Sequence, residues 1–273
     1  MDALMQPGGE SGGRARGWVR DGVRLVDVAP PDGDPDRLLA APGCRLVKDQ
    51  RKVTVGVIDA AGFGPTYVKR YNVSSWRARL ASLFVRSPAR RALAGSRILE
   101  QAGFRAAVPL AAVEYRRWGL VEKSFFLTAE VAGAVPADQF WWALRDETPR
   151  LRRAFIAAIA RLFADLHRAG IYHGDLKDAN VLVRRDDQSV VCYLLDLENV
   201  RRRRTLPRRR RVKNLVQLHR TLGRLATARD NLFFLRAYLG EQGRSRSARR
   251  AWWRRVCAAA RRKDLRHALR GAS

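Results

Sequence analysis

The first half of the chain is dominated by short apolar runs with the spacing of β-strands. Branched and aromatic residues, which favour extended backbone, fill these runs, and polar or glycine-containing turns separate them. The polar tip 49–52 joins the first two runs and the segment 59–65 joins the next two, which predicts an antiparallel meander. The predicted strands are residues 45–48, 53–58, 66–71, 108–114 and 119–131.

The rest of the hydrophobic pattern is helical. Pro88 opens a predicted helix that places Ala92, Ser96 and Leu99 on one face, with Gly103 just beyond its end. After the strands, apolar residues recur every three or four positions, which is the period of an amphipathic helix. We therefore expect an α+β chain, a small antiparallel β unit with one helix followed by a mainly helical unit. Further helical segments are predicted at 150–168, 215–222, 230–239 and in a basic C-terminal stretch, and 76–85 is typical of a basic, aromatic amphipathic insert.

Residues 171–180, I-Y-H-G-D-L-K-D-A-N, interrupt the apolar pattern. They carry a carboxylate at Asp175, a cation at Lys177 and an amide at Asn180. Phosphoryl transfer needs these groups, because a carboxylate can orient the attacking hydroxyl and a lysine can offset charge on the moving phosphoryl group, while an amide oxygen can bind Mg²⁺. The pattern H-x-D-L-K-x-x-N resembles the catalytic loop of protein kinases and their relatives. The commonest role of His173 in such a loop is structural support.

The residues that follow predict a β-hairpin. Two apolar runs, 181–185 and 190–195, flank the polar loop 186–189. Closing the hairpin at that loop brings Asn180 to within one position of Asp196, and the two together would present oxygen ligands to one cation. A surface hairpin with solvated acids is the alternative, but it leaves Asp196 unexplained because that residue ends an apolar run.

The strand pattern itself resembles the small lobe of a protein kinase. Lys69, in T-Y-V-K-R-Y, then corresponds to the lysine that holds the α/β-phosphates of ATP; the alternative is an edge-strand charge that prevents aggregation. Glu100 is the candidate partner of this lysine, although a solvated charge at a helix end fits it equally well. The run F-F-L-T-A-E-V resembles the strand that leads into the kinase hinge, which implies Thr128 as gatekeeper and adenine contacts from the backbone of Ala129 to Val131.

Two features depart from protein kinases. The tip 49–52 has no glycine where a glycine-rich loop would cover the phosphates, so Arg51 and Lys52 or backbone amides would have to do so. D-L-E replaces D-F-G at Asp196, and no A-P-E signature follows. The Arg runs 201–204 and 208–211 come instead, so the usual activation segment is expected to be short or absent.

With these motifs the chain resembles the lipopolysaccharide core kinase family, which shares both departures. The resemblance rests on T-Y-V-K-R-Y, G-F-x-x-x-V-P-L-A, H-G-D-L-K-x-x-N and L-D-L-E, and on N-L-x-x-L and F-L-R-A-Y-L near the C-terminus. It covers roughly residues 44–240 and implies a two-lobed, protein-kinase-like fold. Members of the family phosphorylate heptose or 3-deoxy-manno-octulosonic acid. The expected domains are a flexible arm at 1–43, which contains the short apolar patch Val23–Val28 and adds one strand, an N-lobe at 44–131 and a C-lobe at 132–273 with a basic helical tail.

The composition bears on the partners and the cellular location of the protein. The formal net charge is +28 over 273 residues, mostly from arginine, which indicates anionic partners even if part of it reflects genome composition. No apolar run reaches the roughly 18 residues of a membrane-spanning helix, and the N-terminus lacks the pattern of a signal peptide. Cys44, Cys192 and Cys257 form no metal-binding spacing and are expected to be reduced thiols. These features favour a cytoplasmic protein, but the charge does not choose among lipid headgroups, nucleic acid and acidic glycans as partners. The resemblance to the kinase family implies a peripheral place on the inner face of the cell membrane.

The motifs predict a kinase that uses ATP and Mg²⁺, and the family resemblance implies that it phosphorylates a sugar hydroxyl of a glycolipid like the lipopolysaccharide core. Asp175 would be the base or hydroxyl-orienting group, Lys177 would stabilise the transferring phosphoryl, and Asn180 and Asp196 would hold Mg²⁺. The predicted partners are ATP and an anionic glycolipid or membrane surface. A protein or small-molecule kinase and a non-catalytic, pseudokinase-like binding protein are alternatives, and nucleic acid ranks last because aromatics are not interleaved with the Arg runs. Neither the acceptor nor the oligomeric state is set by the sequence.

Overall fold

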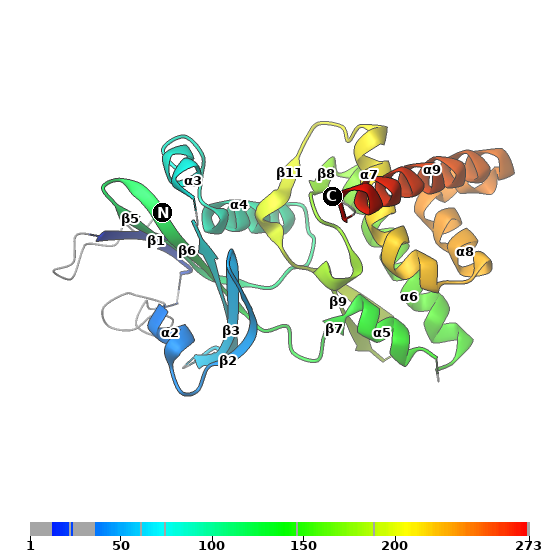
Figure 1. The fold of residues 1–273 in the computed structure, drawn as a ribbon. Coiled ribbons are helices and arrows are strands. Elements are labelled where there is room, and N and C mark those ends of the chain that lie inside the picture. The colour runs from blue at the N-terminus through cyan, green and yellow to red at the C-terminus, as the bar shows by residue number, and fades with distance from the viewer. Residues whose placement is uncertain are drawn as a thin grey trace. The chain divides into compact units, whose positions relative to one another are not determined.

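The computed structural model describes residues 13–21, 23, 36–60, 62–73, 75–145, 147–187 and 189–271, and these form two compact units (Figure 1). The first unit holds the described residues up to Gln101 together with Ala106–Ala132. The second holds Ala102–Arg105 and the described residues from Gly133 onward. Helices and antiparallel strands both contribute, as the α+β prediction requires.

The first unit is built on a six-stranded antiparallel sheet in the order β1-β5-β6-β4-β3-β2. Its β2, β3 and β4 form the predicted meander, in which Val55 lies between Lys48 on one side and Lys69 on the other. The turn between β2 and β3 is shorter than expected, because Gln50 already pairs with Val53. The strands are β1 Gly13–Val19, β2 Arg45–Gln50, β3 Val53–Ala60, β4 Gly64–Asn72, β5 Pro109–Arg117 and β6 Leu120–Ala129.

Both faces of this sheet are covered. Helix α4 (Pro88–Gln101) packs Ala92 and Leu93 against Tyr71 and Phe126 on one face. Buried residues of the other face, among them Val68, lie beneath the short helix α2 (Asp36–Ala40). The helix predicted from Pro88 is confirmed, and the positions expected to share its face, Ala92, Ser96 and Leu99, are all buried.

The N-terminal arm contributes a strand, which lies before the apolar patch Val23–Val28. Strand β1 pairs antiparallel with β5, so that Trp18 lies opposite Ala112. Of this patch, Val23 packs against the sheet core, and 24–28 lie outside the described residues.

The second unit is mainly helical, and its long helix α6 carries much of the core. Leu151, Phe155, Ile159 and Leu166 of α6 are buried, as its spacing predicts, whereas Leu162 of the same predicted face is half-buried. Thr148 caps the N-terminus of the helix. None of the helices in the described part of the chain combines the length and apolar character needed to cross a membrane. The helices are α5 Ala137–Ala143, α6 Pro149–Arg168, α7 Arg208–Leu218, α8 Ala228–Leu239 and α9 Arg246–Gly271, with a π-helical turn at His219–Gly223 and a 3-10 turn at Gly240–Arg244.

Two small sheets flank the segment 174–180 of the second unit. Strand β8 (Ile171–His173) pairs with β11 (Val200–Arg202), and β9 (Val181–Asp186) pairs with β10 (Ser189–Leu194) and with the short β7 (Val135–Pro136). The predicted hairpin is therefore present. Its loop is shorter than the expected 186–189 because Asp186 pairs with Ser189, and Asp187 in the turn adopts a left-handed φ of 47°.

Candidate active site

His173 connects the segment 174–180 to the residues that precede Asp196 by hydrogen bonds. Its Nε2 donates to the carbonyl of Leu195 (2.8 Å), and its Nδ1 accepts from the amide of Asp175 (3.2 Å). These two bonds require the neutral tautomer with a proton on Nε2. Burial lowers the pKa of His173, which favours the same neutral form. The arrangement is that of a structural support, as expected, because neither ring nitrogen is available to act as a base.

Gly174 allows the chain to turn tightly between His173 and the candidate catalytic residue. Its amide donates to the carbonyl of Asn199 (3.1 Å), and a Cβ at this position would lie 2.5 Å from the Cβ of Asn199. No side chain fits there without moving one of the two segments. The close approach of the loop to the residues after Asp196 thus depends on glycine.

Asp175 is held by side chains from both directions. Its Oδ2 accepts from Asn180 Nδ2 (3.1 Å) and lies 3.4 Å from Lys177 Nζ. Its Oδ1 accepts from Gln217 Nε2 (3.3 Å), a residue of α7. The carboxylate is fixed in direction but remains 45% exposed, so it can accept a hydrogen bond from a bound hydroxyl group. That combination of orientation and access is what a proton acceptor in phosphoryl transfer requires.

Asn180 and Asp196 lie at the base of the hairpin, as predicted. The amide of Leu195 donates to the carbonyl of Asn180 (3.0 Å), which places the next residue, Asp196, beside it. Asn180 uses its Nδ2 on Asp175, so its Oδ1 is the side-chain atom that could bind a cation. Asp196 is exposed and has left-handed backbone angles (φ 56°, ψ 53°), a conformation uncommon outside glycine, asparagine and aspartate.

These two residues fit Mg²⁺ by their chemistry. Mg²⁺ is usually held by one or two protein oxygens, with water and substrate phosphates completing its shell. Among the residues that the structure describes there is no cluster of three or more His, Cys, Asp or Glu side chains. An amide oxygen and one carboxylate therefore suit a site that nucleotide phosphates complete, and do not suit an all-protein metal cage.

A buried chain of hydrogen bonds leads away from Asp175, and sequence reasoning missed it. Gln217 Oε1 accepts from Asn214 Nδ2 (2.9 Å), and Asn214 Oδ1 lies 3.2 Å from His167 Nε2. The other nitrogen of His167 lies 2.8 Å from the hydroxyl of Tyr238, which accepts from Arg211 Nε (2.8 Å). Burial lowers the pKa of His167 to about 4, so this ring is neutral near pH 7. The only signal in the sequence is the pair of polar residues, Asn214 and Gln217, three positions apart on one helix.

In the first unit, the strand residues expected to hold the nucleotide lie as follows. Lys69 is half-buried in β4, with Nζ 5.0 Å from the ring centre of Tyr71, on the sheet face that α4 covers. The amide of Ala129 donates to Val108 O (2.9 Å) and that of Glu130 to Pro65 O (2.8 Å). Of the three amides from Ala129 to Val131, that of Val131 is therefore the one that could donate to adenine.

Glu100 lies in the last turn of α4 and is exposed. This placement keeps both of its interpretations open, as partner of Lys69 or as a solvated charge. A buried acid of the same unit, Glu114 in β5, was not singled out from the sequence; it is 2% exposed and is bound by Arg116 (3.0 Å). Arg116 and Glu114 thus form a structural ion pair at the end of the sheet.

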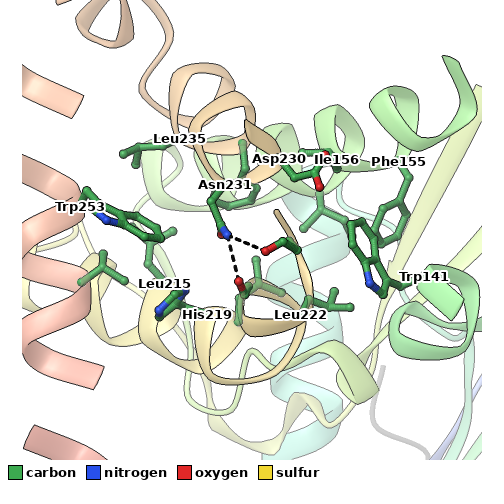
Figure 2. Close-up of a pocket in the computed structure, with 16 residues that line it drawn as sticks. Trp141, Phe155, Ile156, Leu215, His219, Leu222, Asp230, Asn231, Leu235 and Trp253 are labelled. Carbon is green, nitrogen blue, oxygen red and sulfur yellow. Dashed lines mark hydrogen bonds between the residues drawn. The ribbon is translucent and has the colours of Figure 1, made fainter. Parts of the chain in front are cut away.

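An apolar cavity of about 70 Å³ lies in the second unit, among α5–α9 and the π-helical turn (Figure 2). Trp141 and Trp253 line it from different helices. Asn231 closes one side by donating to the carbonyls of Gly223 (2.9 Å) and Ala226 (3.3 Å). The candidate catalytic residues of this unit are not among those that line the cavity. Sequence reasoning did not identify it, because its apolar residues have the spacing of ordinary helix cores.

Comparisons with known proteins identify the family. Residues 62–238 match the model of the "Lipopolysaccharide kinase (Kdo/WaaP) family". Two curated relatives are called lipopolysaccharide core heptose(I) kinase WaaP: that of Pseudomonas aeruginosa is 36% identical over 124 residues, and that of Escherichia coli K12 is 28% identical over 129 residues. The alignments cover 43% and 44% of this chain, and 46% and 48% of those relatives, so the match spans about half their length.

A solved structure described as "WaaP in complex with acyl carrier protein" is similar over a longer stretch. It superposes with a TM-score of 0.61 and 26% identity, over 86% of this chain and 97% of that one. The protein-kinase-like fold expected from the motifs is therefore confirmed. Because the family model covers more than half of the sequence, the chain belongs to the lipopolysaccharide kinase (Kdo/WaaP) family.

Proposed function

We propose that the chain is an ATP- and Mg²⁺-dependent kinase that phosphorylates a sugar hydroxyl, a heptose in the first instance, on a glycolipid like the lipopolysaccharide core. The observation that carries the proposal is the fixed carboxylate of Asp175, with Asn180 and Asp196 beside it at the base of a hairpin. The names of the curated relatives support the choice of heptose over other acceptors.

The residues of the second unit would divide the reaction among them. Asp175 would accept the hydrogen bond of the sugar hydroxyl, orient its oxygen toward the γ-phosphorus of ATP and take its proton. The sugar oxygen would form the new bond to phosphorus as the bond to the β–γ bridging oxygen breaks and ADP leaves. Lys177 would neutralise charge on the transferring phosphoryl group from its place 3.4 Å from Asp175. Asn180 Oδ1 and Asp196 would hold Mg²⁺, which supplies positive charge to the ATP phosphates when bound. The protein contributes positioning and electrostatic stabilisation, and no covalent intermediate is needed.

The residues of the first unit would hold the nucleotide. Lys69 would contact the α/β-phosphates, with Glu100 as its partner, and the backbone of Ala129 and Val131 would contact adenine. Without a glycine-rich loop, the turn that carries Arg51 and Lys52 would cover the phosphates. That turn is fixed at its base, because the backbone amide of Asn72 donates to Lys52 O (3.0 Å) and its side chain to Arg51 O (3.2 Å).

The two Arg runs would bind the anionic part of the acceptor or the surrounding membrane. Only 11 residues separate Asp196 from the start of α7 at Arg208, so the segment is short, as expected. The members of the runs differ in their contacts: Arg201–Arg204, Arg208 and Arg209 are exposed, whereas Arg211 contacts Tyr238 and Trp252. The exposed members are the candidates for binding anions. A solvated basic loop is the alternative.

The decisive experiment measures transfer of labelled phosphate from ATP to purified lipopolysaccharide, lipid and protein fractions, with and without Mg²⁺. We expect Mg²⁺-dependent labelling of lipopolysaccharide, and a loss of about 10²–10⁴-fold in turnover for Asp175→Ala, the usual contribution of a positioned acid–base group. Labelling of protein alone would establish a protein kinase instead. ATP binding without transfer to any fraction would favour the pseudokinase-like alternative. Equal activity of wild type and Asp175→Ala would rule out the mechanism.

Acyl carrier protein, named in the description of the solved relative, is proposed as a second partner. It differs from the glycolipid or membrane partner indicated by the sequence. The apolar lining of the cavity in Figure 2 suits an acyl chain, but its volume of about 70 Å³ requires the cavity to widen before it can admit one. Titration with acylated and with unacylated carrier protein tests this, and tighter binding of the acylated form is expected. Equal affinities would show that the cavity takes no part in binding the carrier protein.

A further inference from the structure

The short helix α3 (Trp76–Ala81) and the turn that follows it expose five large apolar side chains. Trp76 is 67% exposed and Phe84 is 91% exposed, and no residue of α3 is buried. Single exposed apolar residues are ordinary on protein surfaces, but five within ten positions form a patch. We call these residues the α3 patch: Trp76, Leu80, Leu83, Phe84 and Val85.

The α3 patch faces outward because the helix is attached to the sheet by its polar side. Arg79 forms an ion pair with Glu122 of β6 (3.3 Å), and Ser82 Oγ accepts from the amide of Val121 in the same strand (2.9 Å). Ser75 caps the helix by accepting from the amide at its third position (3.3 Å). A surface helix usually buries its apolar stripe and exposes its polar one, and here the order is reversed. In Figure 1 α3 and its turn project from the first unit beyond the sheet.

The spacing of the patch shows that its outward face is continuous. Trp76, Leu80 and Phe84 follow one another at intervals of four, so they lie on one side of the helix and of the turn that prolongs it. Backbone hydrogen bonds continue through that turn, from Ser82 N to Ala78 O (3.2 Å) and from Val85 N to Ala81 O (2.8 Å). The patch is thus a formed apolar surface.

The charges within the sequence segment that carries the α3 patch have one sign, and the acid that this segment meets on the sheet, Glu122, is paired with Arg79. Arg77, Arg79, Arg86 and Arg90 are exposed, and the sequence has no acid between Asn72 and Glu100. The guanidinium of Arg77 lies 5.4 Å from the ring centre of Trp76. Apolar and aromatic side chains flanked by arginines match the boundary of an anionic bilayer, where rings and aliphatic chains enter the acyl region and cations meet the headgroups.

We propose that the α3 patch inserts into the interfacial layer of an anionic lipid bilayer and holds the protein on the membrane. A lipid surface fits better than a protein groove, because the apolar tip projects outward. The flanking arginines also show no arrangement that would match acids at fixed positions on a protein partner. The inference concerns binding and does not depend on the proposed phosphoryl transfer. It would keep a kinase for a lipid-linked acceptor at the surface where that acceptor resides.

The test is co-sedimentation of the full chain with vesicles of phosphatidylcholine, with and without phosphatidylglycerol. The variant carries Trp76→Ser, Leu80→Ser and Phe84→Ser together, and the matched control is Trp118→Ser, an 81% exposed tryptophan beside Arg117 in the turn between β5 and β6. We expect wild type and the control to bind the anionic vesicles, and the triple variant to bind at least about tenfold more weakly. That loss should persist at high salt, because it removes apolar contacts and no charge.

Two results would overturn the inference: vesicle binding by the triple variant equal to that of wild type, or an equal loss in Trp118→Ser. If the triple variant unfolds, vesicle binding of the single variant Phe84→Ser tests the same inference, because a 91% exposed side chain contributes little to folding. Its expected loss is about threefold to tenfold. ATP binding should be unchanged in all these variants. Failure of the kinase reaction with intact vesicle binding would count against the proposed function and not against the α3 patch.

Discussion

Gln217 Nε2 donates to Asp175 Oδ1 (3.3 Å) and to the carbonyl of Gly174 (3.0 Å), and its Oε1 accepts from the amide of Leu176 (3.3 Å). One buried side chain of α7 therefore contacts three successive residues of the candidate catalytic loop. In the proposed mechanism Gln217 would position the carboxylate of Asp175 without touching the reacting groups. The same amide continues the hydrogen-bond chain that passes through Asn214 to His167.

Replacing Gln217 with alanine should lower kcat by about tenfold, because one orienting hydrogen bond to a charged group is worth roughly 1.5 kcal/mol or more. The KM for ATP should stay unchanged, since the nucleotide contacts are untouched. Steady-state kinetics measures both values, and Gln242→Ala, an exposed glutamine of the same unit, is the matched control. A rise in KM with kcat unchanged would show that Gln217 acts on nucleotide binding instead.

Asp196→Asn should weaken the Mg²⁺-dependent part of ATP binding by about tenfold or more, because it removes the carboxylate charge from the candidate metal site. Asparagine tolerates the left-handed backbone of this position nearly as well as aspartate, so the loop should keep its shape. Nucleotide titration with Mg²⁺ and with EDTA separates the metal-dependent part. If Asp196→Asn and wild type differ equally in both titrations, the residue does not bind the metal.

Much of this site could be predicted from short-range patterns in the sequence, and the hairpin shows why. The hydrophobic runs on both sides of the turn set the register, and the register alone brings Asn180 to Asp196. The loop length was predicted less well because Asp187 adopts a left-handed conformation that allows a tighter turn.

Long-range contacts could not be predicted in this way. Gln217 follows an Arg-rich stretch and has the spacing of a solvated helix residue; only the packing of α7 turns it toward Asp175. Strand β1, with the sequence G-R-A-R-G-W-V, contains two glycines and two arginines and has little intrinsic β-propensity. Its extended form comes from pairing with the edge of β5, which no local pattern reveals.

Stability should fall between pH 7 and pH 5 because of His167. Its pKa is lowered from 6.5 to about 4 in the folded chain, first by burial, so the unfolded chain binds the proton more readily in that interval. The contribution of His167 is complete above pH 6.5, declines as the pH falls and is lost near pH 4, with about 2 kcal/mol lost by pH 5. Burial lowers the pKa of His173 and His219 in the same direction, so they add to the trend.

Denaturant unfolding of wild type and His167→Gln at both pH values measures this contribution. Glutamine does not titrate in this range, so the variant should be less stable at pH 7 but should lose less stability on acidification. An identical decrease in the free energy of unfolding for both proteins would assign the pH dependence to other groups.

The last prediction concerns the Arg runs, whose members differ in their contacts. Arg211 donates to Tyr238 and lies 4.9 Å from the ring centre of Trp252, so replacing it should destabilise the second unit. Arg208 and Arg209, exposed in the first turn of α7, face the positive end of the helix dipole with no acid to offset them. That unfavourable placement would be relieved by an approaching anion, so we propose these two side chains as the ones that bind the acceptor surface.

Changing Arg208 and Arg209 to serine should therefore weaken binding to anionic vesicles by about 30-fold at low salt, at roughly 1 kcal/mol for each residue. The loss should shrink as salt rises, because screening acts on the same attraction, unlike the salt-independent loss expected for the α3 patch. Phosphoryl transfer to a small soluble sugar should hardly change, since the catalytic loop is intact. Arg211→Ser, by contrast, should lower the thermal midpoint. If the double variant binds anionic vesicles at low salt as well as wild type does, Arg208 and Arg209 are solvated charges that do not bind the surface.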